Sequence, residues 1–579
     1  MKYIILILVF FIYGCSESRD EKGFLTDKKN AEIKEYILAQ NNKKLPVDLK
    51  GKFGTNFRGL KLVGVDLSKA DLSNIDLSFC EIARVNFSGA KLDELQLEKS
   101  IIQESDFSES TLKNLVAREV DLQASVFEKT ILSNVDFTGA NLAESDFMKA
   151  TIEQVNFESA VLNKVLFEET TLNQVNFQKT NLNESSFKTS NIIKSVFYGS
   201  DLSKVNFNTS KVSDCYFESA DLTNADMTGA EIINSDFSHG IINEVKFIET
   251  KITKSVFDFA ALNTADFTKT IINQSSFKNA SFNNSNFDQV KFKDSVVDFS
   301  TVNDASFTGC NFKNLSAKDI KLHQTSFAST IIDSSQLIRA SFSDSLAKQL
   351  AISNSDLTGS EFVKYRLEDC QFNKSTLTKV LFKNITFQRT RFSLDKLQQI
   401  AIIDSSFEEV ILDNSPIVNS QISNLKNIAS NFINSPATKT ILFNTQGLER
   451  LRSDNSINNI KDLVKLTDLS GMNFYGLDLS NLVFKQINFS DTIFTNANLT
   501  NTVLMSCLLN NDDFTAANLS KSDLSGSTLL GAKFDSTKLN NTKFDYADLT
   551  NVDLSTALVS DISTAHAKLE GTKLPENIK

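Results

Sequence analysis

A period of five residues runs through most of this 579-residue chain. From Phe57 to Leu442 a large apolar residue occupies nearly every position whose number ends in 2 or 7, here called the large register. Two residues earlier, in the small register, small or β-branched residues such as Ala70, Val85 and Ala140 recur. The other three positions are mostly polar or charged. An amphipathic helix repeats about every 3.6 residues and a half-buried strand about every 2, so the pattern is typical of neither.

The period fits a chain that turns a corner at every repeat, with two side chains pointing inward and three outward. Four corners close a square coil of about 20 residues, and such coils stack at about 4.8 Å through backbone hydrogen bonds. Only 4 Pro and 19 Gly are present, which leaves little sequence for conventional loops. A coiled coil, the main alternative, requires a spacing of about 3.5 residues that the sequence lacks.

Several repeats share one motif, a small residue followed by Asp or Asn and then Leu. The clearest copies are Ala70-Asp71-Leu72, Ala140-Asn141-Leu142, Ala220-Asp221-Leu222, Ala497-Asn498-Leu499, Ala517-Asn518-Leu519 and Ala547-Asp548-Leu549. They resemble the A(D/N)LxX motif of the pentapeptide-repeat family. The resemblance covers most of the chain and implies an all-β fold, a right-handed quadrilateral β-helix.

A period of ten lies inside the period of five. From Phe127 to Phe277, Phe occupies 15 of the 16 positions ending in 7, with Met227 the exception, whereas positions ending in 2 hold only Leu, Ile or Val. On a square coil this alternation places Phe on two opposite faces, where rings of successive coils can stack. We expect these side chains to fill the axis rather than to line a ligand channel. The predicted structural core is represented by Leu122, Phe127, Leu132, Phe137, Leu142, Phe147, Phe157, Phe167, Phe177, Phe187, Phe197 and Phe207.

Two exceptions support this register. Ala117 and Ala317 occupy large-register positions, and each is preceded two residues earlier by a leucine, Leu115 or Leu315. Volume lost at one inward position therefore returns at its neighbour, which is the exchange that a packed core tolerates best.

The register breaks after Leu442 and resumes, in positions ending in 4 or 9, from Phe474 to Leu569. The intervening sequence is compatible with a helix, and we expect a helical cap at the start of each array, because an open strand edge invites aggregation. Two arrays joined at an elbow is the favoured arrangement, and one continuous rod with 447–466 looped out is the alternative. The predicted divisions are a signal peptide (1–14), a tether (15–30), a helical cap (31–56), array one (57–446), a helical linker or cap (447–473), array two (474–569) and a tail (570–579).

The first residues read as an export signal. Lys2 precedes an apolar run from Tyr3 to Tyr13, which is shorter than the about 20 residues of a membrane-spanning helix. The run ends at Gly14-Cys15, and Ile12-Tyr13-Gly14-Cys15 resembles the lipobox of bacterial lipoproteins. That resemblance implies cleavage before Cys15 and a lipid on its thiol. By the same analogy Ser16 favours the outer membrane of a Gram-negative host, and an ordinary signal peptide is the alternative.

Few residues could carry chemistry. His239, His323 and His566 are far apart and lie at outward positions, so they predict neither a metal cluster nor a catalytic triad. No phosphate-binding or dinucleotide-binding glycine motif stands out. We therefore expect no catalytic, cofactor-binding or metal-binding residues. The remaining cysteines fall in the small register and are predicted to be buried free thiols: Cys80, Cys215, Cys310, Cys370 and Cys507.

These observations predict a non-catalytic, membrane-anchored lipoprotein of the bacterial cell envelope that presents a rigid scaffold to a protein partner. We expect no nucleic-acid partner, and the oligomeric state stays open between a monomer and a homodimer. The net charge of −11 leaves one alternative, suggested by the family resemblance: an acidic rod that imitates DNA and acts on a topoisomerase such as gyrase. The expected contact or hinge sites are Gly447–Leu466 and the surroundings of Tyr365, where local repacking is the alternative.

Overall fold

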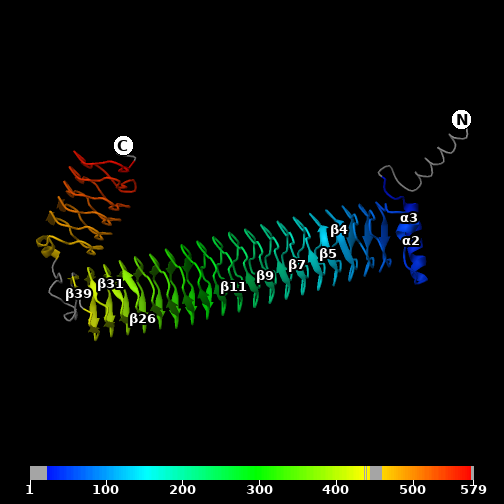
Figure 1. Cartoon of the computed structure of the whole chain (residues 1–579), viewed down its shortest axis with the longest axis horizontal. Helices are drawn as coiled ribbons and strands as arrows, with labels where there is room; N and C mark the ends of the chain where they lie inside the picture. Colours follow the sequence, from blue (N-terminus) through cyan, green and yellow to red (C-terminus); the bar gives the residue numbers. More distant parts are fainter. Residues whose placement is uncertain (1–22, 436, 439, 444–459, 576–579) are drawn as a thin grey trace. The chain divides into compact units, whose positions relative to one another are not determined.

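The chain folds as a right-handed, all-β solenoid of parallel strands, seen here in a computed structural model (Figure 1). The structure describes residues 23–435, 437–438, 440–443 and 460–575. They fall into two compact units, residues 1–305 (unit 1) and 306–579 (unit 2), which are treated separately below. The predicted signal peptide, the predicted lipidation site Cys15 and residues 447–459 of the predicted linker lie outside the described residues.

Unit 1 begins with helices α2 (Asp27–Asn42) and α3 (Leu49–Phe53), at one end of its stack of coils (Figure 1). α2 starts within the segment predicted as tether. The strands are β1 (Lys61–Val63), β2 (Glu81–Ala83), β3 (Ile101–Gln103), β4 (Thr111–Val116), β5 (Ile131–Asp136), β6 (Thr151–Glu153), β7 (Thr171–Asn173), β8 (Asn191–Ile193), β9 (Lys211–Ser213), β10 (Glu231–Ile233), β11 (Lys251–Thr253), β12 (Ile271–Asn273), β13 (Asn286–Asp288), β14 (Lys291–Lys293) and β15 (Thr301–Asn303).

α2 covers the first coil. Its buried residues Asn30, Ile33 and Ile37 share one face, which packs toward the coils. The Asn30 carboxamide oxygen accepts a hydrogen bond from the backbone N–H of Lys61 in β1, at 3.0 Å. β1 is the first strand of its sheet, so this donor has no preceding strand to bond to. The helix thus blocks a sheet edge that would otherwise be open to association.

One coil takes 20 residues, because each strand pairs in parallel with the residues 20 positions further on, as Ile232 does with Ile252. The corners use a backbone conformation that L-residues seldom adopt. Lys164, with φ 59°, and Glu184, with φ 60°, are two of many such non-glycine corners. Each corner N–H donates to a carbonyl of the next coil, as Lys164 does to Asn183 at 2.9 Å. These bonds offset the cost of about 1–2 kcal/mol that a left-handed residue carries.

The family motif has a direct physical reason in these corners. The Asp or Asn that precedes the large residue accepts a hydrogen bond from the N–H two residues later. Asp71 accepts from Ser73 at 3.0 Å, and Asn141 accepts from Ala143 at 3.2 Å. This side-chain turn holds the chain through the bend. It explains why short carboxylates and carboxamides recur at that position.

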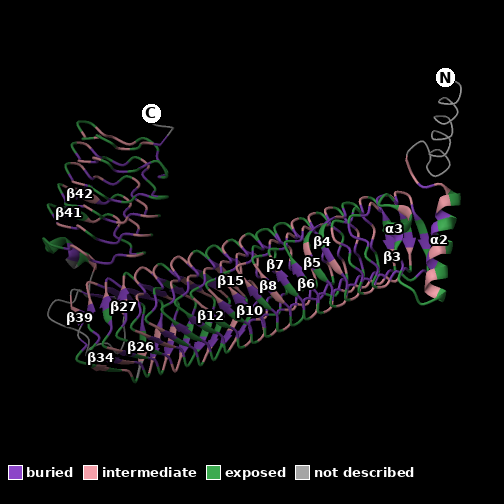
Figure 2. Ribbon diagram, turned by 45° about the vertical axis from the view of Figure 1, so that its right-hand side comes forward, coloured by how far each residue is buried: buried purple, intermediate pink, exposed green. Residues whose placement is uncertain are grey.

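Phenylalanine ladders fill the axis of unit 1, and Figure 2 shows buried residues lining the inside of the coils. Along one face Phe127 and Phe147 stack with ring centroids 4.5 Å apart and planes 3° apart. Across the axis Phe177 and Phe187 meet edge to face, with centroids 6.0 Å apart and planes at 88°. Both geometries are favourable for aromatic quadrupoles. Every residue of the predicted core set is at most 1% exposed, as are Ala117 and its compensating Leu115.

Small-register hydroxyls form a second inner layer. Ser145 Oγ accepts from the N–H of Ser125 at 3.3 Å and donates to the carbonyl of Leu122 at 3.0 Å. A buried serine in this register is therefore satisfied on both sides, which removes the penalty of burying a polar group.

Unit 2 has the same kind of winding, with strands on successive sides of the coil, and the winding resumes after the short 3-10 helix η2 (Ile460–Lys465). Its strands are β16 (Ser306–Thr308), β17 (Asn311–Lys313), β18 (Lys321–His323), β19 (Ser326–Ala328), β20 (Ile331–Asp333), β21 (Ser341–Ser343), β22 (Leu346–Lys348), β23 (Ala351–Ser353), β24 (Glu361–Val363), β25 (Arg366–Glu368), β26 (Gln371–Asn373), β27 (Thr376–Thr378), β28 (Leu381–Lys383), β29 (Thr386–Gln388), β30 (Arg391–Ser393), β31 (Lys396–Gln398), β32 (Ala401–Ile403), β33 (Ser406–Glu408), β34 (Ile411–Asp413), β35 (Ile417–Val418), β36 (Gln421–Ser423), β37 (Lys426–Ile428), β38 (Asn431–Ile433), β39 (Ala437–Thr438), β40 (Ile441–Phe443), β41 (Val483–Lys485) and β42 (Val503–Met505).

Within unit 2 the start of the second array contacts the wall of the first. The Gln399 side-chain amide donates to the carbonyls of Gly471, at 2.6 Å, and Asp491, at 3.1 Å. Asn473 donates in return to the Gln399 carbonyl at 2.7 Å. Nearby, Tyr475 packs on the buried outward residues of β28 and β32: Leu381, Ala401 and Ile403. The outward positions of array one thus become apolar where the second array covers them.

Candidate interaction surface

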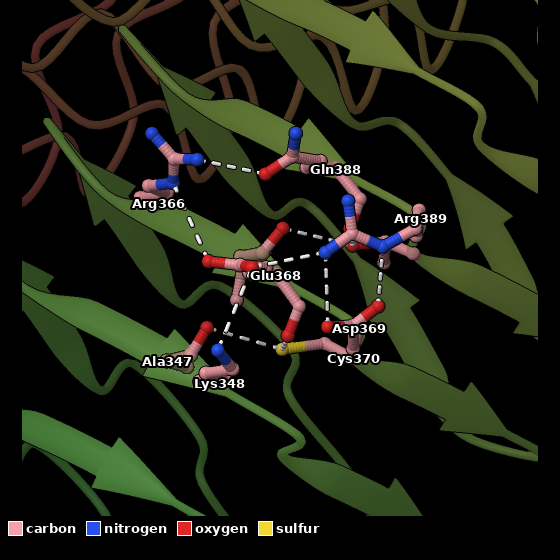
Figure 3. Close-up of polar contacts among 10 residues, drawn as sticks. Ala347, Lys348, Arg366, Glu368, Asp369, Cys370, Gln388 and Arg389 are labelled. Atoms are coloured by element: carbon pink, nitrogen blue, oxygen red, sulfur yellow. Dashed lines mark hydrogen bonds and ion pairs between the residues drawn. The ribbon is translucent and has the colours of Figure 1, made fainter.

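Charged side chains gather on one wall of unit 2, where β22, β25 and β29 are neighbours in one sheet. The outward residues of these strands alternate with buried ones, so each strand presents its side chains to the same side. Figure 3 shows the group, here called the Glu368 network, which comprises Lys348, Arg366, Glu368, Asp369, Gln388 and Arg389.

Arg389 anchors this network. Its Nε lies 2.6 Å from Asp369 Oδ1, and its Nη2 donates to Asp369 Oδ2 at 3.0 Å and to Glu368 Oε1 at 2.9 Å. On the other side Arg366 Nη2 donates to Gln388 Oε1 at 2.7 Å, and its Nε lies 3.8 Å from Glu368 Oε2. The Glu368 carboxylate is therefore held between two guanidinium groups (Figure 3).

The electrostatics follow from this geometry. The hydrogen bond from Arg389 is the main cause that holds the pKa of the Asp369 carboxyl below its usual value, and the same bond raises the pKa of Arg389. Such exposed pairs contribute little to stability, but a two-pronged arginine–carboxylate contact fixes both side chains in one geometry. The network is thus a rigid pattern of charges on a flat wall.

Two shallow hollows lie along the corner that precedes the strands of the network. One, of about 700 Å³, is lined in part by Asp344, Lys364 and Arg366. The other, of about 580 Å³, is lined in part by Asp404 and Lys426. Asn384 borders both, so the hollows adjoin along the wall. Their mixed charges suit a polar protein surface better than an apolar ligand.

Tyr365, which the sequence suggested as a contact site or as local repacking, is 2% exposed. Its ring packs edge to face against the stacked pair Phe342 and Phe362, with centroids 6.1 and 5.8 Å away and planes nearly perpendicular. Burial raises the pKa of its phenol well above the usual range. The small Ala347 occupies the large register one coil earlier, so Tyr365 supplies volume to the core, and its neighbours rather than Tyr365 itself form the surface.

The predicted thiols are buried and form no disulfide among the described residues, and burial raises the pKa of Cys80 and Cys215 to about 12 and of Cys370 to about 11. Cys310 and Cys507 are likewise buried. The three histidines lie apart on the surface. His239 stacks on Phe259 at 4.9 Å, His566 stacks on Tyr546 at 4.9 Å, and His323 Nδ1 lies 2.9 Å from Ser343 Oγ.

Two buried carboxyl groups were not foreseen, because the five-residue pattern does not distinguish them from serine. Asp395 is 3% exposed and Asp512 is fully buried, both in the small register. Asp395 accepts from the N–H groups of Ser375, at 2.8 Å, and Ser393, at 2.9 Å. Burial nevertheless raises the pKa of Asp395 to about 7, and it raises that of Asp512 as well.

Among the described residues no group of three or more His, Cys, Asp or Glu is placed to bind a metal ion. A search of the same residues finds no helix with the length and apolarity needed to span a bilayer. Among the described residues the Glu368 carboxylate lies within 3.8 Å of three basic side chains, those of Lys348, Arg366 and Arg389.

Comparison with known proteins settles the family. A family model described as a pentapeptide repeat region matches residues 171–247, and one described as pentapeptide repeats matches six segments: 54–78, 118–154, 152–188, 260–296, 467–511 and 513–555. The chain belongs to the pentapeptide-repeat family. The matched segments lie in both arrays and include corners of the kind described above, such as those at Asp71 and Lys164.

Solved structures with detectable likeness include three pentapeptide-repeat proteins. Rfr23 of the cyanobacterium Cyanothece is 19% identical over 22% of this chain and 96% of its own, with a TM-score of 0.20. HetL of Nostoc, involved in heterocyst differentiation regulation, is 15% identical over 54% of this chain and 90% of its own, with a TM-score of 0.11. QnrB1, a plasmid-mediated fluoroquinolone resistance protein, is 15% identical over 40% of this chain and 83% of its own, with a TM-score of 0.16. The comparison with curated proteins gives no match.

Proposed function

We propose that this pentapeptide-repeat protein is a bacterial lipoprotein that is anchored through Cys15 and offers its solenoid wall as a non-catalytic scaffold for a protein partner. The anchor rests on the sequence Lys2, Tyr3–Tyr13 and Gly14-Cys15. The single observation that supports the scaffold role is the Glu368 network, whose charges are held in a fixed geometry on a flat wall. Fixed complementary charges give specificity and register to a protein interface more than affinity.

The anchor and the wall can be tested separately in intact cells. Cys15→Ala should release the protein from the membrane fraction without changing its circular dichroism. Retention in the membrane fraction would refute the lipid anchor.

For the wall, a crosslinker applied to cells should capture a partner that Arg389→Gln loses. Arg118→Gln is the matched control, because Arg118 Nε also pairs with a carboxylate, Asp136, at 2.6 Å on the exposed surface of unit 1. Equal capture by both variants would place the partner elsewhere.

The net charge of −11 favours a second candidate, an acidic DNA mimic that acts on a topoisomerase such as gyrase. The charges of the corners do not form a uniform acidic ladder, however. Lys164 lies 3.6 Å from Glu144 one coil before it, and Lys204 lies 3.0 Å from Glu184. A DNA duplex presents phosphates of one sign along each strand, so the scaffold is the better-supported function. Inhibition of gyrase supercoiling by the purified chain would favour the second candidate.

A further inference from the structure

The end of unit 1 that carries α2 differs in charge from the rest of the protein. Residues 23–61, here called the basic cap, hold nine basic and four acidic side chains, a net charge of +5 in a chain of net charge −11. Most of the excess follows α2, in the loop and helix that contain Lys43, Lys44, Lys50 and Lys52, all of them exposed. A local charge opposite to that of the whole chain indicates a partner of opposite sign at this end.

The basic cap combines these lysines with exposed apolar groups. Leu45 is 51% exposed directly after Lys43 and Lys44, and Leu38 on α2 is 41% exposed. Within the described part of the chain the ammonium groups of Lys43 and Lys44 form no ion pair. Beside Leu45 a hollow of about 380 Å³ is lined by Lys44 and Lys69 and also by Asp66 and Ser68. Basic side chains next to exposed leucine are the combination that peripheral membrane surfaces use.

The chain enters the basic cap at a fixed point. The N–H of Leu25 donates to the carbonyl of Arg58 at 2.9 Å, and the Phe24 ring lies 5.4 Å from that of Phe79. The Arg58 guanidinium lies 4.7 Å from the Phe79 centroid, so it packs against the same cluster. Phe24 and Leu25, which the sequence placed in the predicted tether, are therefore held against the first coil.

Chain geometry then limits how far the basic cap can lie from a lipid on Cys15. Eight residue steps separate Cys15 from Gly23, which span at most about 28 Å when fully extended. α2, with 16 residues, is about 24 Å long, so the lysines at its end lie within a similar distance of the entry point. A lipid on Cys15 would keep the basic cap within reach of the bilayer, whose anionic headgroups attract lysine within about a Debye length of 8–10 Å.

We propose that the basic cap is a membrane-contact surface that binds anionic phospholipid headgroups through Lys43 and Lys44, with Leu45 entering the interface. The inference rests on the proposed lipid anchor for its geometry, but the contact itself requires no acyl chain. It orients the stack of unit 1 with its capped end toward the bilayer, which leaves the coils beyond it free to meet a partner.

The test uses the mature chain, residues 15–579, with Cys15→Ser so that no acyl chain can be attached. Sedimentation with vesicles of phosphatidylcholine, with and without phosphatidylglycerol, measures the partition coefficient. We expect binding only to the anionic vesicles, weakened by added salt. Lys43→Gln with Lys44→Gln should lower the partition coefficient by about thirtyfold, the loss expected for two lysines near an anionic surface.

Lys211→Gln with Lys251→Gln is the matched control, because these exposed lysines of β9 and β11 remove the same charge far from the cap. Equal binding to both kinds of vesicle, no binding, or equal losses in the two double variants would overturn the proposal. Mass spectrometry of the N-terminus of the protein from cells tests the anchor independently. An unmodified Cys15 together with vesicle binding that requires Lys43 and Lys44 would remove the anchor and leave the contact surface.

Discussion

Replacing Asp395 by serine should remove a pH-dependent loss of stability from unit 2. The Asp395 carboxyl is buried, and its pKa is raised from 3.8 to about 7. The folded state therefore holds this proton to a higher pH than the unfolded state does. The contribution of this group to the free energy of unfolding is fully present below pH about 4 and falls as the pH rises to about 7. A difference of about three units corresponds to at most about 4 kcal/mol.

Serine fits this position because neighbouring coils use it there. Ser415 Oγ accepts the N–H of Asp395 at 3.0 Å, and Ser375 Oγ accepts the N–H of Ser355 at 3.3 Å. Asp395→Ser should therefore keep an acceptor for the Ser375 N–H without burying a carboxylate. We expect the variant to be more stable than the natural chain at pH 8, with the difference shrinking toward pH 4.

Hydrogen exchange of peptides around residues 375–415, compared between the two proteins at each pH, measures this difference, because intrinsic exchange rates then cancel. Local measurement is preferable because a solenoid need not unfold in one step. Asp404→Ser, which removes an exposed carboxylate nine residues further along the chain, is the control and should leave the pH dependence intact. Identical pH dependence in the natural chain and Asp395→Ser would refute the reasoning.

Three further predictions follow from the packing. Phe177→Asp buries a charge inside the stacked ladder and should unfold the neighbouring coils, seen as lost circular dichroism and new proteolytic cleavage, whereas Phe177→Leu should keep the fold; a folded Asp variant would show that the large register is not interior. Gly471→Ala should destabilise the protein more than Gly476→Ala does. Both glycines have positive φ, but only a Cβ at Gly471 would lie 3.2 Å from Gln399 Nε2. Equal protection of residues 469–475 from hydrogen exchange in the two variants would contradict this prediction. A maleimide should label none of the five buried thiols in the native protein at neutral pH and all of them in urea; native labelling of more than one would count against their burial.

Much of the architecture could be predicted because the repeat is short. The five-residue period fixes which side chains point inward, so the phenylalanine ladders and the buried thiols follow from position alone. The compensation of Ala117 by Leu115 was readable for the same reason, since both residues lie in one repeat. The compensation of Ala347 could not be read from the sequence in this way, because Tyr365, which supplies volume nearby, lies in the next coil.

The candidate surface depends on contacts across coils. Arg389 meets Asp369, 20 residues or one coil before it, and it also meets Glu368, which immediately precedes Asp369 in the chain. Reading the sequence in columns of 20 residues would have paired Arg389 with Asp369, but it would not have shown that Glu368 lies between two arginines. That arrangement depends on side-chain reach across a sheet, which a list of positions does not contain.

The amino-acid sequence by itself determined the winding of this protein, its inward and outward positions and its family, because each depends on residues within one repeat. The tertiary structure decided which charges meet on a wall, that Asp395 is buried against two backbone N–H groups, and that Gln399 meets Gly471 across 72 residues. The physical reason is that burial direction is a local property of a repeating backbone, whereas electrostatic and packing partners are set only when separate coils are brought together.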